Sequence, residues 1–199
     1  MSVKHRIAVF DFDGTITTKD TLLEFIRFSK GNFPFIWGFM LHFPLLIAFK
    51  LKLYPNWKIK QKLFSYYFKG MKLSDFDFLC KDFFQHASGL IRPEAKKAIK
   101  RHIDAGDSLV IISASIENWV CPFAYHLNIQ TVLCTKIETD RAGLLTGNFS
   151  TSNCYGQEKV NRLIKLFPQR EDYYLVAYGD SKGDKELMDF ADEKMYRKI

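Results

Sequence analysis

A short apolar run near the amino terminus ends in two aspartates that are one residue apart, and this stretch constrains the fold most strongly. Residues 6–17 read RIAVFDFDGTIT, so a strand-like segment, residues 7–10, leads directly into Asp11, Asp13 and an Asp-Gly turn. Two carboxylates at the end of a buried strand need compensation, and a divalent cation together with a phosphate is the obvious candidate. A plain strand followed by a turn is the alternative, so other segments must decide.

Two more segments have the continuous β-branched character of parallel strands that are covered on both faces, residues 108–112 (SLVII) and 174–178 (YLVAY). Helical patterns flank them at residues 93–105, 116–127 and 158–167. Strands that alternate with helices predict an α/β fold, a doubly wound, Rossmann-like parallel sheet. Residues 131–150 read instead as a small β-hairpin with a polar turn, and residues 194–199 read as a last strand.

Residues 17–88 interrupt this alternation, because nothing in them resembles a parallel strand. They read as four helices, at residues 21–29, 33–53, 57–69 and 74–86. An all-helical insertion directly after the first strand is expected to cover the carboxyl edge of the sheet, where open α/β folds bind ligands. We therefore expect an α/β core domain made of residues 1–16 and 89–199, with an inserted helical cap domain, residues 17–88.

The net charge of +7 is concentrated in this insertion. Residues 25–74 contain nine lysines and arginines and no Asp or Glu, which leaves 20 basic and 22 acidic residues elsewhere. A local basic block indicates an anionic partner at that place rather than a generally basic protein.

The same block is rich in apolar and aromatic residues. Residues 31–49 run for nineteen positions without a formal charge, and Lys50 and Lys52 follow them. Aromatic side chains beside lysines are typical of an interfacial helix on anionic lipid, which predicts peripheral membrane contact through the cap. The alternative stays open that these residues only form the cap's own core, since Pro34 and Pro44 weaken a membrane span.

The four cysteines, Cys80, Cys121, Cys134 and Cys154, show no CxxC spacing and indicate neither a zinc site nor a disulfide framework. No apolar segment of signal-peptide length precedes Asp11. We expect reduced thiols and a cytoplasmic protein, at the inner face of the membrane where the cap contacts lipid.

Polar residues follow the other predicted strands in the same way as the first. Ser113 ends the SLVII strand, Lys159 follows NCYGQE, and GDSKGD, residues 179–184, follows YLVAY. With DFDGT at residues 11–15 and the spaced GDSxxD, the chain resembles the haloacid dehalogenase-like (HAD) hydrolase superfamily. The resemblance lies in subfamily IB, the branch that includes phosphoserine phosphatase, and it covers nearly the whole chain, including the position of the helical insertion.

This resemblance implies a phosphomonoester hydrolase, a phosphatase that works through an aspartyl-phosphate. Asp11 would be the nucleophile, and Asp13 would protonate the leaving oxygen and then activate water. Ser113 would donate a hydrogen bond to the phosphoryl group, and Lys159 would offset charge around the nucleophile. A simpler role for Ser113 is to cap the helix that follows, as Ser115 is expected to do.

The resemblance also implies Mg²⁺ as the cofactor. Asp11, Asp180 and the main-chain carbonyl of Asp13 would hold the ion, and Asp184 would bind a metal water or orient the ligands. Alternatively, Asp184 is a carboxylate favoured at the start of a helix. Lys165 has no such support and is expected on the surface.

The expected substrate contacts differ from those of phosphoserine phosphatases. Asp20 stands where they carry a Glu, Phe64 where they carry an Arg, and Gly183 where they carry an Asn. A hydrophobic residue cannot pair with a substrate carboxylate, which counts against phosphoserine. Gly14, Asp20, Ser113 and Lys159 are the residues expected to contact the substrate.

The cap resembles that of branch members assigned to phosphatidylglycerophosphate dephosphorylation, which also carry a long apolar stretch followed by basic residues. This resemblance implies a lipid head-group phosphate as substrate. The alternatives are a soluble phosphatase of a small phosphorylated metabolite and a non-enzymatic anion-binding module. No nucleic-acid partner is expected, because three converging carboxylates repel phosphate unless metal is present.

Overall fold

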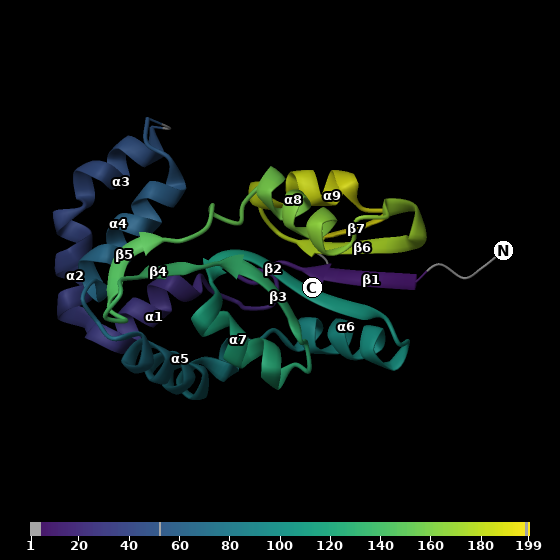
Figure 1. Cartoon of the computed structure of the whole chain (residues 1–199), viewed down its shortest axis with the longest axis horizontal. Coiled ribbons are helices and arrows are strands. Elements are labelled where there is room, and N and C mark those ends of the chain that lie inside the picture. Colours follow the sequence, from purple (N-terminus) through teal and green to yellow (C-terminus); the bar gives the residue numbers. More distant parts are fainter. Residues whose placement is uncertain (1–4, 52, 198) are drawn as a thin grey trace.

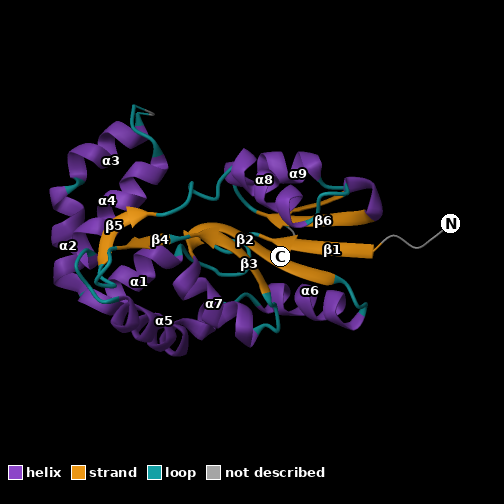
Figure 2. Ribbon diagram, in the orientation of Figure 1, coloured by secondary structure: helices purple, strands orange, loops and turns teal. Residues whose placement is uncertain are grey.

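The computed structural model describes residues 5–51, 53–197 and 199, and its centre is a five-stranded parallel sheet (Figure 1, Figure 2). The strand order is β3–β2–β1–β6–β7, so the first strand of the chain lies in the middle. The strands are β1 (His5–Phe10), β2 (Ser108–Ile116), β3 (Thr131–Thr135), β6 (Tyr173–Gly179) and β7 (Glu193–Tyr196). This confirms the predicted doubly wound α/β fold.

Helices cover both faces of the sheet, which explains why its strands are continuously apolar. Along β1, Ala8 and Phe10 point to one face and Ile7 and Val9 to the other, as the two-residue period of a strand requires. Helices α6 (Pro93–Asp104) and α7 (Glu117–His126) cover the first face, and α8 (Gln157–Leu166) and α9 (Lys185–Phe190) cover the second (Figure 1). All four β1 side chains are buried as a result.

The strand register aligns the carboxyl ends of three central strands. Phe10 at the end of β1 pairs with Ile111 of β2 and with Tyr178 of β6. The residues that follow these positions therefore meet at one edge of the sheet. This edge is where the polar motifs of the sequence are placed.

The helical region between β1 and α6, residues 17–88, is called the insertion below. Its helices are α1 (Thr21–Lys30), α2 (Asn32–Leu41), α3 (Phe43–Lys50), α4 (Asn56–Phe68) and α5 (Leu73–Ala87). Helices α1, α4 and α5 enclose five buried phenylalanines, Phe25, Phe64, Phe68, Phe76 and Phe83. The ring of Phe25 also stacks on Trp119 of α7, with centroids 5.0 Å apart, so this aromatic core continues into the core of the sheet.

The predicted single helix over residues 33–53 is wrong, because the structure has two helices there. Helices α2 and α3 meet at His42 with a bend of 63°. Pro44 lies in the first turn of α3, where its missing N–H costs nothing, but its ring would clash with the carbonyl one turn earlier in a continuous helix. Within the described residues no single helix reaches the length and apolarity of a membrane span, whereas the bent α2–α3 pair together does.

The hairpin expected over residues 131–150 is only partly correct. Its first segment is β3, which joins the edge of the central sheet beside β2, with Cys134 and Thr135 buried. The hairpin itself is β4 (Ile137–Thr139) and β5 (Leu145–Phe149). The expected last strand, residues 194–199, corresponds to β7, which ends at Tyr196, and residue 198 lies outside the described residues.

The hairpin packs on the insertion rather than on the sheet (Figure 1). The N–H of Gly70 donates to the carbonyl of Leu145 at 2.8 Å, and the N–H of Leu145 donates to the carbonyl of Met71 at 2.8 Å. Short 3₁₀ turns lie at Ser88–Leu90, Arg170–Asp172 and Lys182–Asp184.

Candidate active site

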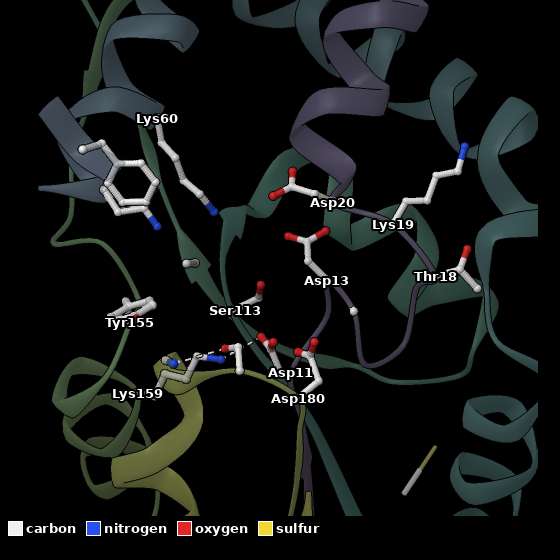
Figure 3. Close-up of a pocket in the computed structure, with 16 residues that line it drawn as sticks. Asp11, Asp13, Thr18, Lys19, Asp20, Lys60, Ser113, Tyr155, Lys159 and Asp180 are labelled. Atoms are coloured by element: carbon white, nitrogen blue, oxygen red, sulfur yellow. Dashed lines mark hydrogen bonds and ion pairs between the residues drawn. The ribbon is translucent and has the colours of Figure 1, made fainter. Parts of the chain in front are cut away.

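Three carboxylates from different parts of the chain converge at the carboxyl edge of the sheet. Asp11 follows β1, Asp180 follows β6, and Asp184 ends the Lys182–Asp184 turn. One oxygen of each lies within 4.8 Å of an oxygen of the other two, and Figure 3 shows Asp11 and Asp180 side by side. The side chains that the sequence placed in a metal site are therefore brought together.

Lys159 at the start of α8 lies between two of these carboxylates. Its Nζ donates to Asp11 Oδ1 at 2.7 Å and to Asp184 Oδ1 at 2.6 Å, and all three side chains are buried. Burial alone would disfavour the charge on this lysine, but the adjacent carboxylates prevail and the pKa of Lys159 is raised. The lysine thus remains a cation that fixes one oxygen of Asp11.

One lysine does not neutralise the cluster. Burial raises the pKa of Asp11 to about 7, although the charge of Lys159 opposes this shift. Burial and the nearby Asp184 also raise the pKa of Asp180. An uncompensated group of buried carboxylate oxygens fits a hard divalent cation such as Mg²⁺, whose charge would lower both pKa values.

Asp184 has little capacity left for a cation. Its Oδ1 accepts from Lys159, and its Oδ2 accepts from the N–H of Ser181 at 3.0 Å, from Ser181 Oγ at 2.9 Å and from the N–H of Asp180 at 3.3 Å. These bonds hold the backbone that carries Asp180. The geometry therefore favours orientation of the site over direct metal binding for Asp184, and Asp11 and Asp180 have the freer oxygens.

Asp13 is held by residues from two other elements. Its Oδ1 accepts from the N–H of Thr21 at 2.8 Å and from Thr21 Oγ1 at 2.6 Å, and its Oδ2 accepts a hydrogen bond from Ser115. Burial and the charge of Asp20 raise the pKa of Asp13, while Lys60 opposes the shift. A carboxyl group with a raised pKa is suited to act as a general acid.

The expectation that Ser115 caps a helix is wrong. Strand β2 continues to Ile116, so Ser115 is still extended and its hydroxyl reaches Asp13 instead. Ser113 does not cap a helix either, because it lies within β2, well before α7 starts at Glu117. Ser113 Oγ accepts from the N–H of Ser115 at 3.2 Å, which leaves the Ser113 hydroxyl proton available to the cavity.

Two glycines let the backbone approach the site closely. Gly14 has a φ of +79°, and a Cβ there would overlap the carboxylate of Asp180. A Cβ on Gly183 would overlap the ring of Tyr155, which lines the cavity. The ring of Tyr155 therefore leaves no room at position 183 for an Asn side chain, which phosphoserine phosphatases carry there.

A cavity of about 540 Å³ lies between this edge and the insertion. Asp11, Asp13, Gly14, Ser113, Tyr155, Lys159, Asp180, Ser181 and Gly183 line it from the sheet side, and Thr18, Lys19, Asp20, Phe49, Asn56 and Lys60 from the insertion. Figure 3 shows Lys60 extending toward Asp13 and Ser113, and the carboxylate of Asp20 above that of Asp13, turned to the side on which Lys60 lies. Sequence reasoning did not single out Lys60, Tyr155 or Thr21, and only the basic block gave any signal for Lys60.

The two residues compared with phosphoserine phosphatases have different surroundings. Asp20 precedes α1 and caps it, since its Oδ1 accepts from the N–H groups of Leu22 at 3.0 Å and Leu23 at 3.3 Å. Phe64 is fully buried in the aromatic core of the insertion and does not line the cavity. On α4 the residue that lines the cavity and acts on Asp13 by its charge is Lys60, one turn before Phe64.

Solved structures share this architecture. A protein of unknown function from Bordetella pertussis Tohama I superimposes with a TM-score of 0.83 at 16% identity, over 98% of this chain and 90% of that one. A phosphoserine phosphatase, solved as an analogue of its phospho-aspartyl intermediate, gives a TM-score of 0.63 at 18% identity, over 98% of this chain and 87% of that one. At these identities the similarity shows the fold.

Sequence relatives extend the comparison. Protein CicA of Caulobacter vibrioides is 31% identical over 192 residues, which cover 96% of this chain and 85% of that protein. A histidinol-phosphatase of Neisseria meningitidis is 28% identical over 109 residues, 52% of this chain and 49% of that protein. The family model of haloacid dehalogenase-like hydrolases matches residues 8–189, from β1 to α9, and so takes in both the carboxylate cluster and the insertion. The chain belongs to the haloacid dehalogenase-like hydrolase family.

Proposed function

We propose that this protein is a Mg²⁺-dependent phosphomonoester hydrolase of the phosphoserine phosphatase-like branch, subfamily IB, and that Asp11 is transiently phosphorylated. The observation that carries the proposal is the position of Asp11: Lys159 holds one of its oxygens, and Asp180 lies beside it at the floor of the cavity. In this proposal residues 1–16 and 89–199 are the catalytic core, and the insertion is the cap that covers it.

In the first step a carboxylate oxygen of Asp11 attacks phosphorus and forms a P–O bond, while the bond from phosphorus to the leaving oxygen breaks. Asp13 donates its proton to that oxygen, and the alcohol leaves. Lys159 and the Ser113 hydroxyl stabilise the charge on the phosphoryl oxygens. Mg²⁺ held by Asp11, Asp180 and the Asp13 carbonyl would supply positive charge beside the phosphoryl group.

In the second step Asp13, now a carboxylate, takes a proton from water. The resulting hydroxide attacks phosphorus, the bond to Asp11 breaks, and inorganic phosphate is released. Thr21 and Ser115 hold Asp13 in place through both steps, because each donates a hydrogen bond to one of its oxygens. The cycle ends with Asp11 ionised and Asp13 protonated, as it began.

Acid-quench trapping of the phosphorylated protein tests this proposal. With a ³²P-labelled phosphomonoester and Mg²⁺, we expect acid-stable label on the wild-type chain at Asp11, found by borohydride reduction and peptide mapping. Asp11→Asn should carry no label, and EDTA should abolish labelling until Mg²⁺ is restored. Asp104→Asn, at an exposed residue of α6, is the control and should label normally. Label at another residue, or turnover that persists in Asp11→Asn, would overturn the assignment.

For the substrate we propose the phosphate of a lipid head group, hydrolysed at a membrane surface. The support is the α2–α3 surface, a set of exposed apolar side chains over residues 32–53: Phe33, Ile36, Trp37, Met40, Leu41, Phe43, Ile47, Phe49, Leu51 and Leu53. Phe33 is 78% exposed and Met40 63%, so these are not the side chains of a closed core.

Charge and position favour a membrane as the partner of this surface. No Asp or Glu lies in residues 25–74, and Lys50 and Lys58 flank the apolar side chains; Lys52 lies outside the described residues. Lysines beside exposed aromatic and aliphatic groups match an anionic bilayer. Phe49 both belongs to the α2–α3 surface and lines the catalytic cavity, which gives a lipid a short path between the two.

Vesicle sedimentation tests this part separately. We expect binding to phosphatidylcholine vesicles that contain anionic phosphatidylglycerol, with a blue shift of Trp37 fluorescence, and loss of binding in Trp37→Ser/Met40→Ser. Tyr125→Ser is the control, because Tyr125 is 86% exposed but lies on α7, outside the α2–α3 surface. Absence of vesicle binding would overturn the membrane proposal and favour a small phosphorylated metabolite as substrate.

A further inference from the structure

Three lysines among the described residues line the cavity, and they differ in whether a carboxylate pairs with them. Lys159 is paired with Asp11 and Asp184, and Lys19 is paired with Glu24 at 3.2 Å. Among the residues that the structure describes, no carboxylate lies within ion-pair distance of Lys60 Nζ. Within the part of the chain that the structure describes, Lys60 therefore brings to the cavity a cation that forms no ion pair, although its charge acts on Asp13 over a longer distance.

The side chain of Lys60 is directed to this place by apolar packing. Lys60 is half-buried on α4, and the crevice beside it is lined by Leu22 of α1, Trp119 of α7 and Phe149 of β5. A lysine in such surroundings buries its alkyl chain and extends the ammonium group toward the polar side. That side is the cavity, where the charge of Lys60 acts on the carboxyl group of Asp13 (Figure 3).

We propose that Lys60 forms a subsite for a second anionic group of the substrate, carried by the part that leaves. This inference rests on the proposed function, in which Asp13 protonates the leaving oxygen. Lys60 lies on the Asp13 side of the cavity, whereas Lys159 contacts Asp11 on the other side (Figure 3). A group on the Lys60 side meets the leaving group rather than the transferred phosphoryl.

The substrate class that follows is a phosphomonoester with a second negative charge, a carboxylate or a phosphodiester, beyond the ester oxygen. Asp20 also lines this side of the cavity, and its Oδ1 already accepts hydrogen bonds from main-chain N–H groups of α1. On α4 Lys60 lines the cavity, whereas Phe64 is buried, and Lys60 would select for anions by direct ion pairing.

A series of paired substrates tests this subsite. Each pair consists of an alkyl phosphate and the ω-carboxyalkyl phosphate of equal length, with spacers of two to six carbons, and a third set carries a methyl phosphodiester in place of the carboxylate. We expect kcat/KM to favour the doubly anionic ester about 10-fold at one spacer length, because a charged hydrogen bond is gained. The set that shows the larger preference identifies the second anion.

Variants assign the preference to Lys60. In Lys60→Met the ratio of the two kcat/KM values should fall to about 1, whereas Lys60→Arg should keep most of it. Lys62→Met, at an exposed lysine of the same helix that does not line the cavity, is the matched control and should retain the full ratio. Inhibition constants of the corresponding phosphonates should follow the same pattern without any turnover.

The outcomes separate this inference from the proposed function. If alkyl phosphates are hydrolysed but no spacer length gives a preference, or if Lys60→Met keeps the preference, the subsite is refuted and the phosphatase stands. If no phosphate ester is hydrolysed, the proposed function itself fails.

Discussion

The carboxyl edge of the sheet and the α2–α3 surface differ in how their side chains are surrounded. At the sheet edge the carboxylates of Asp13 and Asp184 have both oxygens engaged by neighbouring donors. On the α2–α3 surface large apolar side chains lie open to solvent, and α3 has no fully buried residue among those described. The buried carboxylates are thus held by hydrogen bonds, whereas the apolar side chains of the α2–α3 surface remain exposed to solvent.

Each of the two regions therefore lacks a different kind of contact. The sheet edge lacks positive charge, because Lys159 balances only part of the negative charge of the three clustered carboxylates. The apolar side chains of the α2–α3 surface lack apolar groups to pack against. A cation would stabilise the first region and an apolar surface the second, so substitutions in the two regions should respond to different additions.

The largest effect is expected for Lys159→Met, which leaves Asp11 and Asp184 buried without their cation. Loss of one partner of a buried ion pair should lower the free energy of unfolding by about 3–5 kcal/mol. Turnover should fall about 100- to 1,000-fold. Urea unfolding with and without Mg²⁺ is the measurement, and Mg²⁺ should recover part of the stability. Lys165→Met, at an exposed lysine of α8, should change neither quantity; equal effects of the two variants would contradict the role of the pair.

A smaller effect is expected for Gly14→Ala, which tests how tightly the sheet edge is packed. Gly14 and Gly106 have φ values of +79° and +75°, so alanine is strained at both. Only at Gly14 does the new methyl group also meet the Asp180 carboxylate, since nothing lies within 4 Å at Gly106. Gly14→Ala should reduce turnover about 100-fold, whereas Gly106→Ala should cost only about 1–2 kcal/mol of stability. Steady-state kinetics and thermal unfolding separate these outcomes.

Ser115→Ala should have a moderate effect on activity. It removes the hydrogen bond to one oxygen of Asp13, while Thr21 still holds the other. We expect kcat to fall about 10-fold. Ser150→Ala is the control, because it removes a hydroxyl that donates to the carbonyl of Ile137 and neither residue lines the cavity. An unchanged kcat in Ser115→Ala would show that Thr21 alone positions Asp13.

The smallest effect on stability is expected on the α2–α3 surface. Phe33→Ser should change the free energy of unfolding by no more than about 0.5 kcal/mol, because Phe33 is 78% exposed. Phe83→Ala, in the aromatic core of the same insertion, should cost about 3–5 kcal/mol, because Phe83 is fully buried. Chemical unfolding of both variants without lipid is the measurement. A large loss in Phe33→Ser would mean that this side chain packs within the chain, and the comparison between the two regions would fail.

The sequence predicted the fold and the convergence of the carboxylates because both depend on short-range patterns. Buried strands are read from continuous β-branched runs, and Asp11, Ser113 and Asp180 directly follow or end such runs. In a parallel sheet this is sufficient to bring them to one edge. The family expected from DFDGT and GDSxxD is confirmed by the match over residues 8–189.

The errors arose where tertiary contacts decide. Ser115 resembled a helix cap until the extent of β2 placed its hydroxyl on Asp13, and Thr21 gave no signal because its partner is eight residues away across a loop. Lys60 was one of nine basic residues in its block, and only the packing of α4 shows that it reaches the cavity. The break between α2 and α3 at His42 was not predicted, because the apolar run continues through Pro44.

The attachment of the β4–β5 hairpin to the insertion limits how the cavity can open. Counting the hairpin, the polypeptide passes between the sheet and this region four times, near residues 17, 90, 136 and 151. A hinge motion at only the two ends of the insertion would break the main-chain hydrogen bonds that join Gly70 and Met71 to Leu145. Substrate entry that needs a wider mouth must therefore move helices and hairpin as one body, with flexing at all four crossings.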